Sequence, residues 1–404
     1  MKCKLVLIGA GMASGRMLER LFKAADGAYE VTLFGAERRG NYNRIMLSSL
    51  LAGETTYDEI ITHDAAWYER HGITCRFGET VTRIDRAAKT VHSRNGETPY
   101  DKLVLATGSA PFIVPVAGKE LQGVITFRDL DDVDAMLAVA KRPETQAVVL
   151  GGGLLGLEAA AALKARGMGV VVLHLMGHLM ERQLDPTAGL LLQKELEKRG
   201  IKIHCHAQTT AILGHKRTEA VLLDDGTVYQ ADLVVMAAGI RPETRIATDA
   251  GLHVERGVVI DDRMRTSDPD ILAIGECVEH AGVCYGLVEP IYEMAAVAAK
   301  TLAGEECAFR SAELGAQLKV TGIDVFSAGD FIGAAGTEAM TLSDPGLRTY
   351  KKLVIKEGRL VGAVLFGDTI DGAWYLDLIR NRTAIEAMRD DLMFGNAMAE
   401  RKAA

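Results

Sequence analysis

The sequence of 404 residues lacks several features that mark common classes of protein. Basic residues do not predominate, because 46 lysines and arginines stand against 54 acidic residues and the net charge is −8. This balance argues against non-specific binding of nucleic acid and offers no polybasic patch to a membrane. No apolar run approaches the roughly 18 residues that a bilayer-spanning helix needs. There is no low-complexity tract and no short-period repeat.

Cysteine is sparse and unpatterned. The six cysteines form no C-x-x-C pair and no spacing typical of a zinc site, so we name no metal ligands. Scattered cysteines are typical of reduced thiols in a cytoplasmic protein. We expect no redox role for the nearest pair, Cys277 and Cys284. Residues 4–8 read as a strand, which leaves no room for a signal peptide, and we expect a cytoplasmic protein.

Glycine, by contrast, is abundant, with 42 residues, and one stretch concentrates it. Residues 148–165 read as a buried strand, a glycine-only turn and an Ala-rich helix, with Gly151, Gly153 and Gly156 at G-x-G-x-x-G spacing. Gly151 allows the tight turn, Gly153 lets backbone N–H groups approach a pyrophosphate, and Gly156 lets helix and strand pack closely. Taken alone, the motif is equally compatible with a close-packed turn that binds nothing.

A related turn occurs earlier, at residues 5–15. Its spacing is G-x-G-x-x-x-G from Gly9 and Gly11, and Ser14 stands where the third glycine often lies. The alternating residues 29–34 read as the second strand of a βαβ unit. An acid after that strand normally binds the adenosine ribose, and the nearest acid here is Glu37. In the later unit the same position is His174, which lacks a carboxylate and, if protonated, would favour a 2′-phosphate.

Each glycine turn is followed by a buried strand that closes on small residues, glycine and proline. The first closes at Ala106-Thr107-Gly108 and the second at Ala238-Gly239. Two dinucleotide-binding domains of similar build explain this long-range repetition. A third buried strand, residues 271–274, closes on Gly275 and Glu276, whose carboxylate can bind the hydroxyls of a polyol.

The remaining chain is less specific. Residues 41–51 are either an ordinary surface loop or a segment that brings Arg44 to a diphosphate. We expect a helix over residues 57–72 and another from Glu289, with proline in its first turn. From residue 318 we expect strands at 318–321, 349–355 and 359–365, helices at 372–381 and 384–390, and a frayed tail after residue 396. This last part reads as a separate α+β domain.

These stretches, in this order, resemble FAD-dependent pyridine-nucleotide oxidoreductases with two dinucleotide domains. The resemblance implies an α/β fold of two Rossmann-like domains, with the NAD domain inserted in the FAD domain, plus a C-terminal α+β domain. The expected boundaries are 1–115 and 240–310 for FAD, 116–239 for NAD(P) and 311–404 for the C-terminal domain. The resemblance also allows a homodimer with the C-terminal domain at its interface.

Residues 42–49 look like the flavin-contacting stretch of the ferredoxin and rubredoxin reductase branch. Residues 180–185, 318–326 and 366–368 look most like the N-terminal flavoprotein portion of NAD(P)H-dependent nitrite reductase large subunits, and electron-transfer subunits of assimilatory nitrate reductases are similar. His174 fits that group. Ser49 departs from the ferredoxin and rubredoxin reductase branch, where a lysine often stands. The sequence carries no Cys-rich iron–sulfur or sirohaem region, so we do not expect it to reduce nitrite alone. Residues 45–51 contain no cysteine, which disfavours a disulfide reductase.

The resemblance implies an FAD-dependent oxidoreductase that takes electrons from NADH, with NADPH as the alternative, and passes them to a redox partner such as a nitrate or nitrite reductase component or a ferredoxin-like protein. Other functions left open are a ferredoxin or rubredoxin reductase of an oxygenase system, an NADH oxidase or peroxide reductase, and a flavin-binding NADH sensor. Hydride transfer needs no side-chain acid or base, so none is named as catalytic, and Glu158 is expected near the nicotinamide. The residues expected to hold the cofactors are Gly9, Gly11, Ala13, Ser14, Glu37, Arg44, Ser48, Thr107, Gly108, Gly275, Glu276 and Glu289 for FAD, and Gly151, Gly153, Leu155, Gly156, Glu158, His174 and Gly239 for the nicotinamide dinucleotide.

Overall fold

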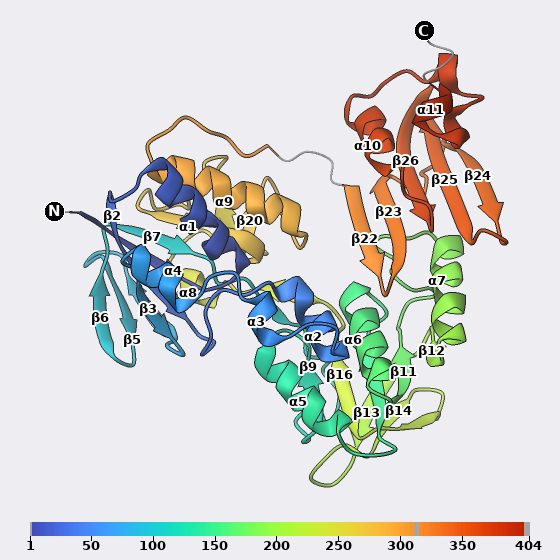
Figure 1. Cartoon of the computed structure of the whole chain (residues 1–404), viewed down its shortest axis with the longest axis horizontal. Helices are drawn as coiled ribbons and strands as arrows, with labels where there is room; N and C mark the ends of the chain where they lie inside the picture. Colours follow the sequence, from blue (N-terminus) through green and yellow to red (C-terminus); the bar gives the residue numbers. More distant parts are fainter. Residues whose placement is uncertain (1, 311–314, 400–404) are drawn as a thin grey trace. The chain divides into compact units, whose positions relative to one another are not determined.

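The structure is a computed structural model that describes residues 2–310 and 315–399 (Figure 1). The chain divides into two compact units, one formed by residues 1–111 with 240–311 and the other by residues 112–239 with 312–404. None of the helices within the described residues combines the length and apolar character needed to span a bilayer.

A five-stranded parallel sheet forms the centre of the first unit, in the order β19-β7-β1-β2-β3. Its central strands are continuous runs of buried aliphatic residues, as expected where helices and loops cover both faces of a parallel sheet. The two long helices of this unit, α1 and α9, pack against each other (Figure 1). The bounds are β1 (Cys3–Ile8), α1 (Met12–Ala24), β2 (Tyr29–Gly35), β3 (Thr74–Phe77), β7 (Lys102–Leu105), β19 (Ile271–Ala273) and α9 (Val288–Leu302).

Smaller elements surround this sheet. The antiparallel hairpins are β4 (Val81–Asp85), β5 (Thr90–Ser93) and β6 (Gly96–Pro99), with β8 (Ser109–Pro111) pairing β17 (Ile240–Pro242). A further small sheet contains β18 (Val258–Ile260), β20 (Val278–His280) and β21 (Val283–Cys284). The short helices are α2 (Leu47–Ala52), α3 (Tyr57–Ile60), α4 (Ala65–Arg70) and α8 (Arg245–Asp249), with 3₁₀ turns at Arg44–Met46 and Gly275–Cys277.

The expected helix over residues 57–72 is in fact two short helices, α3 and α4. Residues between them are extended because they pair with the 41–43 segment, where Thr62 N–H donates to the carbonyl of Asn41. Asp64 then starts α4 by accepting a hydrogen bond from the N–H of Trp67 at 2.7 Å. Pairing to a segment distant in sequence therefore overrides the helical pattern.

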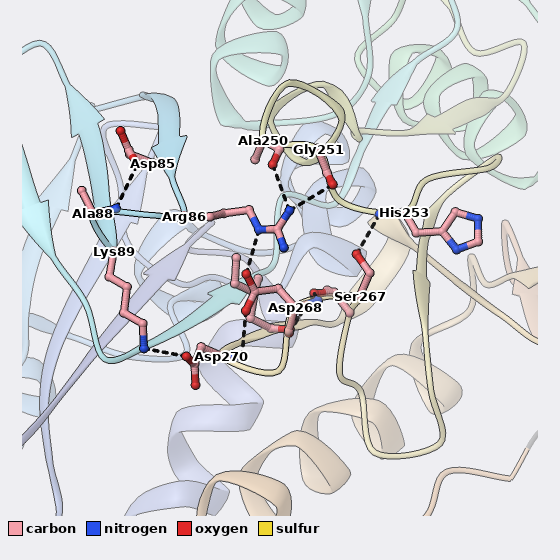
Figure 2. Close-up of polar contacts among 12 residues, drawn as sticks. Asp85, Arg86, Ala88, Lys89, Ala250, Gly251, His253, Ser267, Asp268 and Asp270 are labelled. Atoms are coloured by element: carbon pink, nitrogen blue, oxygen red, sulfur yellow. Dashed lines mark hydrogen bonds and ion pairs between the residues drawn. The ribbon is translucent and has the colours of Figure 1, made fainter.

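The two segments of the first unit are joined by partly exposed ion pairs (Figure 2). Arg86, between β4 and β5, donates to Asp268 at 2.7 Å and to the carbonyl of Gly251 at 3.1 Å. Lys89 donates to Asp270 at 2.6 Å, and Lys102 reaches its other oxygen at 2.6 Å. These hydrogen bonds lower the pKa of Asp270 below its usual range. The 250–270 stretch is thus tied to the N-terminal half of the same unit.

The second unit contains another five-stranded parallel sheet, in the order β12-β11-β10-β16-β9. A three-stranded antiparallel sheet, β13-β14-β15, shares its hydrophobic core. The bounds are β9 (Val124–Thr126), α5 (Leu130–Ala140), β10 (Gln146–Leu150), α6 (Leu154–Ala165), β11 (Gly169–Leu173), α7 (Pro186–Lys198), β12 (Ile201–His204), β13 (Thr209–Leu213), β14 (Ala220–Leu223), β15 (Val228–Gln230) and β16 (Leu233–Met236).

The C-terminal part of this unit is an antiparallel sheet in the order β22-β23-β26-β25-β24, with α10 packed on it around the buried Tyr375. The bounds are β22 (Gly315–Val320), β23 (Ile323–Gly329), β24 (Glu338–Asp344), β25 (Thr349–Lys356), β26 (Arg359–Phe366), α10 (Gly372–Arg380) and α11 (Asn396–Ala399). Tyr350 of β25 donates a hydrogen bond to Asp185, which caps α7, at 2.8 Å, so this sheet is bonded to the rest of the unit.

Two expectations for this region are wrong. The expected helix over residues 384–390 is only a 3₁₀ turn, Glu386–Met388. Residues 396–399 are not frayed, because Asn396 starts α11 with its N–H bonded to Asp371 at 3.1 Å and Ala399 is buried. Residues 400–404 lie outside the described part of the chain.

Candidate functional site

The first glycine turn connects β1 to α1 and can be built only from glycine at its start. Gly9 has φ +114°, and a Cβ there would overlap the carbonyl oxygen of Ala106 at the end of β7. Gly11 is the N-cap of α1 and faces open space, with no heavy atom of the described chain within 4 Å of where its Cβ would be. No side chain of the described residues caps the N-terminus of α1. Such a helix end presents N–H groups to an anion.

Hydrogen bonds from residues of the 41–68 region hold the turn in place. The amide nitrogen of Asn41 donates to the carbonyl of Gly11 at 2.6 Å, and its oxygen accepts from the hydroxyl of Tyr68 at 2.6 Å. Asn41 is only 1% exposed, so the interpretation of residues 41–51 as an ordinary surface loop is wrong. Sequence reasoning missed Asn41, whose one signal was its place before the Tyr-Asn-Arg run.

Ser14 is fully buried, and its hydroxyl donates to the carbonyl of Gly11 at 2.9 Å. Its contact with the cofactor stays a prediction. Its role in this structure is to brace the turn from inside, because a buried hydroxyl must find an internal partner.

Further predicted residues meet at the carboxyl ends of the same strands. Gly275, with φ +90°, brings the segment after β19 against α1, where a Cβ on it would lie 3.2 Å from the Cβ of Ala13. Ser109, after Gly108, donates its hydroxyl to Glu276 at 2.8 Å, while Thr107 donates to the carbonyl of Glu243 at 2.7 Å. The carboxyl edge of a doubly wound sheet is where ligands of this fold bind.

Glu37 and Arg44 are joined as an ion pair. The guanidinium of Arg44 lies 2.5 Å from one carboxylate oxygen of Glu37, and the hydroxyl of Tyr42 donates to the other at 2.7 Å. The carboxylate thus lies just beyond the end of β2, although it follows the strand by two residues. Both partners are partly exposed, so the pair lies at the surface of the unit.

Ser48 and Glu289 are positioned less specifically. Ser48 lies in α2 with its hydroxyl bonded to the carbonyl of Ile45 at 3.5 Å. Glu289 is exposed in the first turn of α9. Among the described residues, no hydrogen bond connects either of them to the glycine turn, so their roles stay predictions.

The glycines of the second turn have the same steric surroundings as those of the first. Gly151 has φ +128°, and a Cβ there would overlap the carbonyl oxygen of Ala237, as a Cβ on Gly9 would overlap that of Ala106. Gly153, the N-cap of α6, again faces open space. Gly156 is required because a Cβ would overlap the carbonyl oxygen of Gly151. The second turn therefore has the same geometry for receiving a diphosphate.

Other predicted residues of this turn take ordinary places around it. Leu155 and Glu158 lie in α6, both partly buried, and Gly239 follows β16 with φ +113°. No described interaction identifies what Glu158 would do toward a nicotinamide, and its role stays a prediction.

The surroundings of His174 bear on its predicted contact with the dinucleotide. It lies at the end of β11, as expected, but it is 6% exposed and both ring nitrogens are used within the protein. Nδ1 accepts the N–H of Gly152 at 3.0 Å, and Nε2 lies 3.1 Å from Glu181. Because Nδ1 is an acceptor, Nε2 carries the proton and donates it. The ring therefore holds the turn and leaves no nitrogen for a ribose or a 2′-phosphate.

All six cysteines are free. Cys277 is fully buried, and burial raises its pKa. Burial also raises the pKa of Cys75, to about 11. Thiols of this kind stay protonated at neutral pH and are poor nucleophiles.

The sequence was compared with known families, proteins and structures. Residues 3–301 match the pyridine nucleotide-disulphide oxidoreductase family, and residues 316–383 match the rubredoxin NAD+ reductase C-terminal domain. Among solved structures, NADH:rubredoxin oxidoreductase from Clostridium acetobutylicum has a TM-score of 0.82 and 25% identity, with 98% of this chain and 100% of that chain covered. The predicted fold of two Rossmann-like domains and a C-terminal α+β domain is confirmed.

Two curated relatives come from Bacillus subtilis (strain 168). The chain is 47% identical over 386 residues to nitrite reductase [NAD(P)H], covering 95% of this chain and 48% of that protein. It is 40% identical over 394 residues to the assimilatory nitrate reductase electron transfer subunit, covering 97% of this chain and 51% of that protein. The chain thus spans about half the length of these relatives.

The family match covers most of the chain and agrees with the two glycine turns. The chain therefore belongs to the pyridine nucleotide-disulphide oxidoreductase family and is an FAD-dependent NAD(P)H oxidoreductase.

Proposed function

We propose that this chain takes electrons from NADH through FAD and passes them to a separate redox protein or subunit in nitrate or nitrite reduction. The observation that carries this proposal is the pair of matching glycine turns, one in each unit, at Gly9 and Gly151. Two dinucleotides in one chain are what a flavin reductase needs. The similarity to a nitrite reductase and to a nitrate reductase electron transfer subunit supports the choice of acceptor.

The residues present fit both cofactors. At each turn a glycine lies where a Cβ would overlap a strand-end carbonyl, and the helix N-cap beside it, Gly11 or Gly153, opens to free space. These N-termini would hold the two diphosphates through backbone N–H groups. Bound FAD supplies the hydride acceptance and the one-electron release that this chemistry requires.

The side chains have supporting tasks. Ser109 orients the carboxylate of Glu276, which would bind hydroxyls of the flavin side chain. Glu37, fixed by Arg44 and Tyr42, would accept a hydroxyl of the FAD adenosine, and Arg44 would favour the diphosphate. Glu158 would lie near the nicotinamide amide. No side chain needs to move a proton for hydride transfer.

We propose the expected domain assignment for the same reasons: FAD on residues 1–115 and 240–310, the nicotinamide dinucleotide on 116–239, and a C-terminal domain from 311.

We also propose the cytoplasm as the compartment, since the six cysteines are free thiols and free thiols persist in reducing compartments. The acceptor is proposed to be an iron–sulfur or molybdenum protein, because flavin can release electrons singly to such a centre.

The test is anaerobic stopped-flow mixing of the FAD-loaded protein with NADH. Rapid loss of flavin absorbance, followed by reoxidation on adding a nitrate or nitrite reductase component, is the expected result. Fast turnover with O₂ and no gain from any carrier protein would refute the carrier function and favour an NADH oxidase. Slow bleaching with a lasting charge-transfer band would favour a sensor.

Two glycine variants assign the cofactors to their turns. Gly11 and Gly153 have negative φ and open space around them, so alanine should be tolerated by the fold at both positions. Gly11→Ala should weaken FAD retention, while Gly153→Ala should retain FAD and weaken NADH binding, because each methyl group would intrude on one diphosphate. Each variant is the control for the other, and equal effects on both cofactors would contradict the assignment.

A further inference from the structure

The ribose end of the second turn lacks the acid that normally follows the second strand of such a unit. The residue at that position, His174, accepts from Gly152 N–H and donates to Glu181. It therefore fixes the glycine turn and leaves the usual task of a residue at this position, which is to accept ribose hydroxyls, to another group.

The chain after His174 returns to the same turn. The N–H of Met180 donates to the carbonyl of Gly152 at 3.0 Å, with Met180 at φ +53°. Leu179 and Met180 are fully buried beneath this segment. Their burial fixes the position of the next residue, Glu181, whose carboxylate then lies 3.1 Å from the tip of the His174 ring.

The carboxylate of Glu181 has capacity left for a ligand. Oε2 accepts the proton on Nε2 of His174, and no hydrogen bond to Oε1 occurs within the described residues. The side chain of Glu181 is 27% exposed, whereas the side chain of His174 is 8% exposed, so the carboxylate reaches solvent past the ring. A carboxylate with one oxygen hydrogen-bonded and the other available can accept a hydrogen bond from a hydroxyl group, and its negative charge repels a phosphate.

We propose that Glu181 binds the adenosine ribose of the nicotinamide dinucleotide and selects NADH over NADPH, with His174 as the residue that positions it. The proposal rests on the proposed function, because it takes the second turn as the nicotinamide dinucleotide site. Loop 174–185 thus supplies, from a position seven residues after His174, the acid that the strand end lacks.

The test is titration calorimetry on the oxidised, FAD-loaded protein, which binds NAD⁺ without turnover. The probes are NAD⁺, NADP⁺ and the NAD⁺ analogue that lacks the adenosine 2′-hydroxyl. The wild-type protein should bind NAD⁺ about tenfold more tightly than the 2′-deoxy analogue. Glu181→Ala should lose that difference by weakening NAD⁺ alone, and Glu181→Gln should gain affinity for NADP⁺ relative to NAD⁺.

A merely structural role gives a different result. If Glu181 only held His174, then Glu181→Ala would weaken NAD⁺ and the 2′-deoxy analogue equally, and this would overturn the proposal. A wild-type preference for NADP⁺ would also overturn it and would favour the exposed neighbour, Arg182, as the ligand. Glu219→Gln, an exposed change in the same unit, is the matched control and should leave all three affinities unchanged. Failure of wild-type protein to bind any of the probes while holding FAD would instead refute the proposed function.

Discussion

Asp185 and Tyr350 provide a quantitative test of how the C-terminal sheet is attached within the second unit. Asp185 is 3% exposed, caps α7 by accepting from the N–H of Ala188 at 3.0 Å, and accepts the hydroxyl of Tyr350 at 2.8 Å. Asp185→Ala removes a helix cap, at a cost of about 1 kcal/mol. It also leaves the buried Tyr350 hydroxyl without its partner, which adds about 2 kcal/mol. The expected loss of stability is therefore about 3 kcal/mol.

Tyr350→Phe should cost less, about 1.5 kcal/mol, because the cap remains and only the hydrogen bond to a charged group is lost. Burial and the neighbouring Asp185 raise the pKa of Tyr350, so its hydroxyl remains a proton donor throughout the neutral pH range. The double variant should lose about 2 kcal/mol, which is less than the sum of the two single losses and less than the loss in Asp185→Ala alone, because it leaves no buried hydroxyl without a partner.

The assay uses the distribution of the two tryptophans, Trp67 in the first unit and Trp374 in α10 of the second. In a Trp67→Phe background, urea unfolding followed by fluorescence reports the second unit alone. Additive losses, to within about 0.4 kcal/mol, would show that Asp185 and Tyr350 are not coupled and would refute the reasoning.

Three further perturbations have defined outcomes. Burial lowers the pKa of His63 below the usual 6.5. Because the unfolded chain takes up the proton first, the first unit should lose stability as the pH falls below about 6.5. His63→Gln should remove this pH dependence of stability when unfolding is followed by Trp67 fluorescence. Arg86→Ala should destabilise the same unit by about 1 kcal/mol in urea unfolding, a modest value because the side chain is 34% exposed. Gly151→Ala should prevent folding of the second unit. Gly167 also has a positive φ, but open space surrounds it, so Gly167→Ala should cost only about 1 kcal/mol in thermal unfolding. Equal effects of the two variants would contradict the steric argument.

The glycine turns could be predicted from sequence because their geometry is set within a few residues. A strand, a residue with positive φ and a helix N-terminus leave a local pattern, and Gly9, Gly11, Gly151, Gly153 and Gly156 all take the expected places. The parallel sheets were predictable for a similar reason, since continuous aliphatic runs bounded by glycine are typical of strands buried on both faces.

The missed features depend on partners distant in sequence. The break between α3 and α4 comes from pairing with residues 41–43, which no helical pattern reveals. β24 was not expected because most of its side chains are exposed and its residues lack a regular alternation. The role of His174 was hidden because its partners, Gly152 and Glu181, lie on opposite sides of it along the chain and meet only in the folded unit.

Loop 174–185 is anchored at both ends by buried side chains. At one end His174 bonds the glycine turn, and at the other Asp185 bonds α7 and the C-terminal sheet. A ligand that orders the first end therefore restrains the second, and amide exchange in β25 should slow when the dinucleotide binds. By reciprocity, anything that docks on the C-terminal sheet and tightens Tyr350 against Asp185 would raise the affinity for the dinucleotide by the same factor.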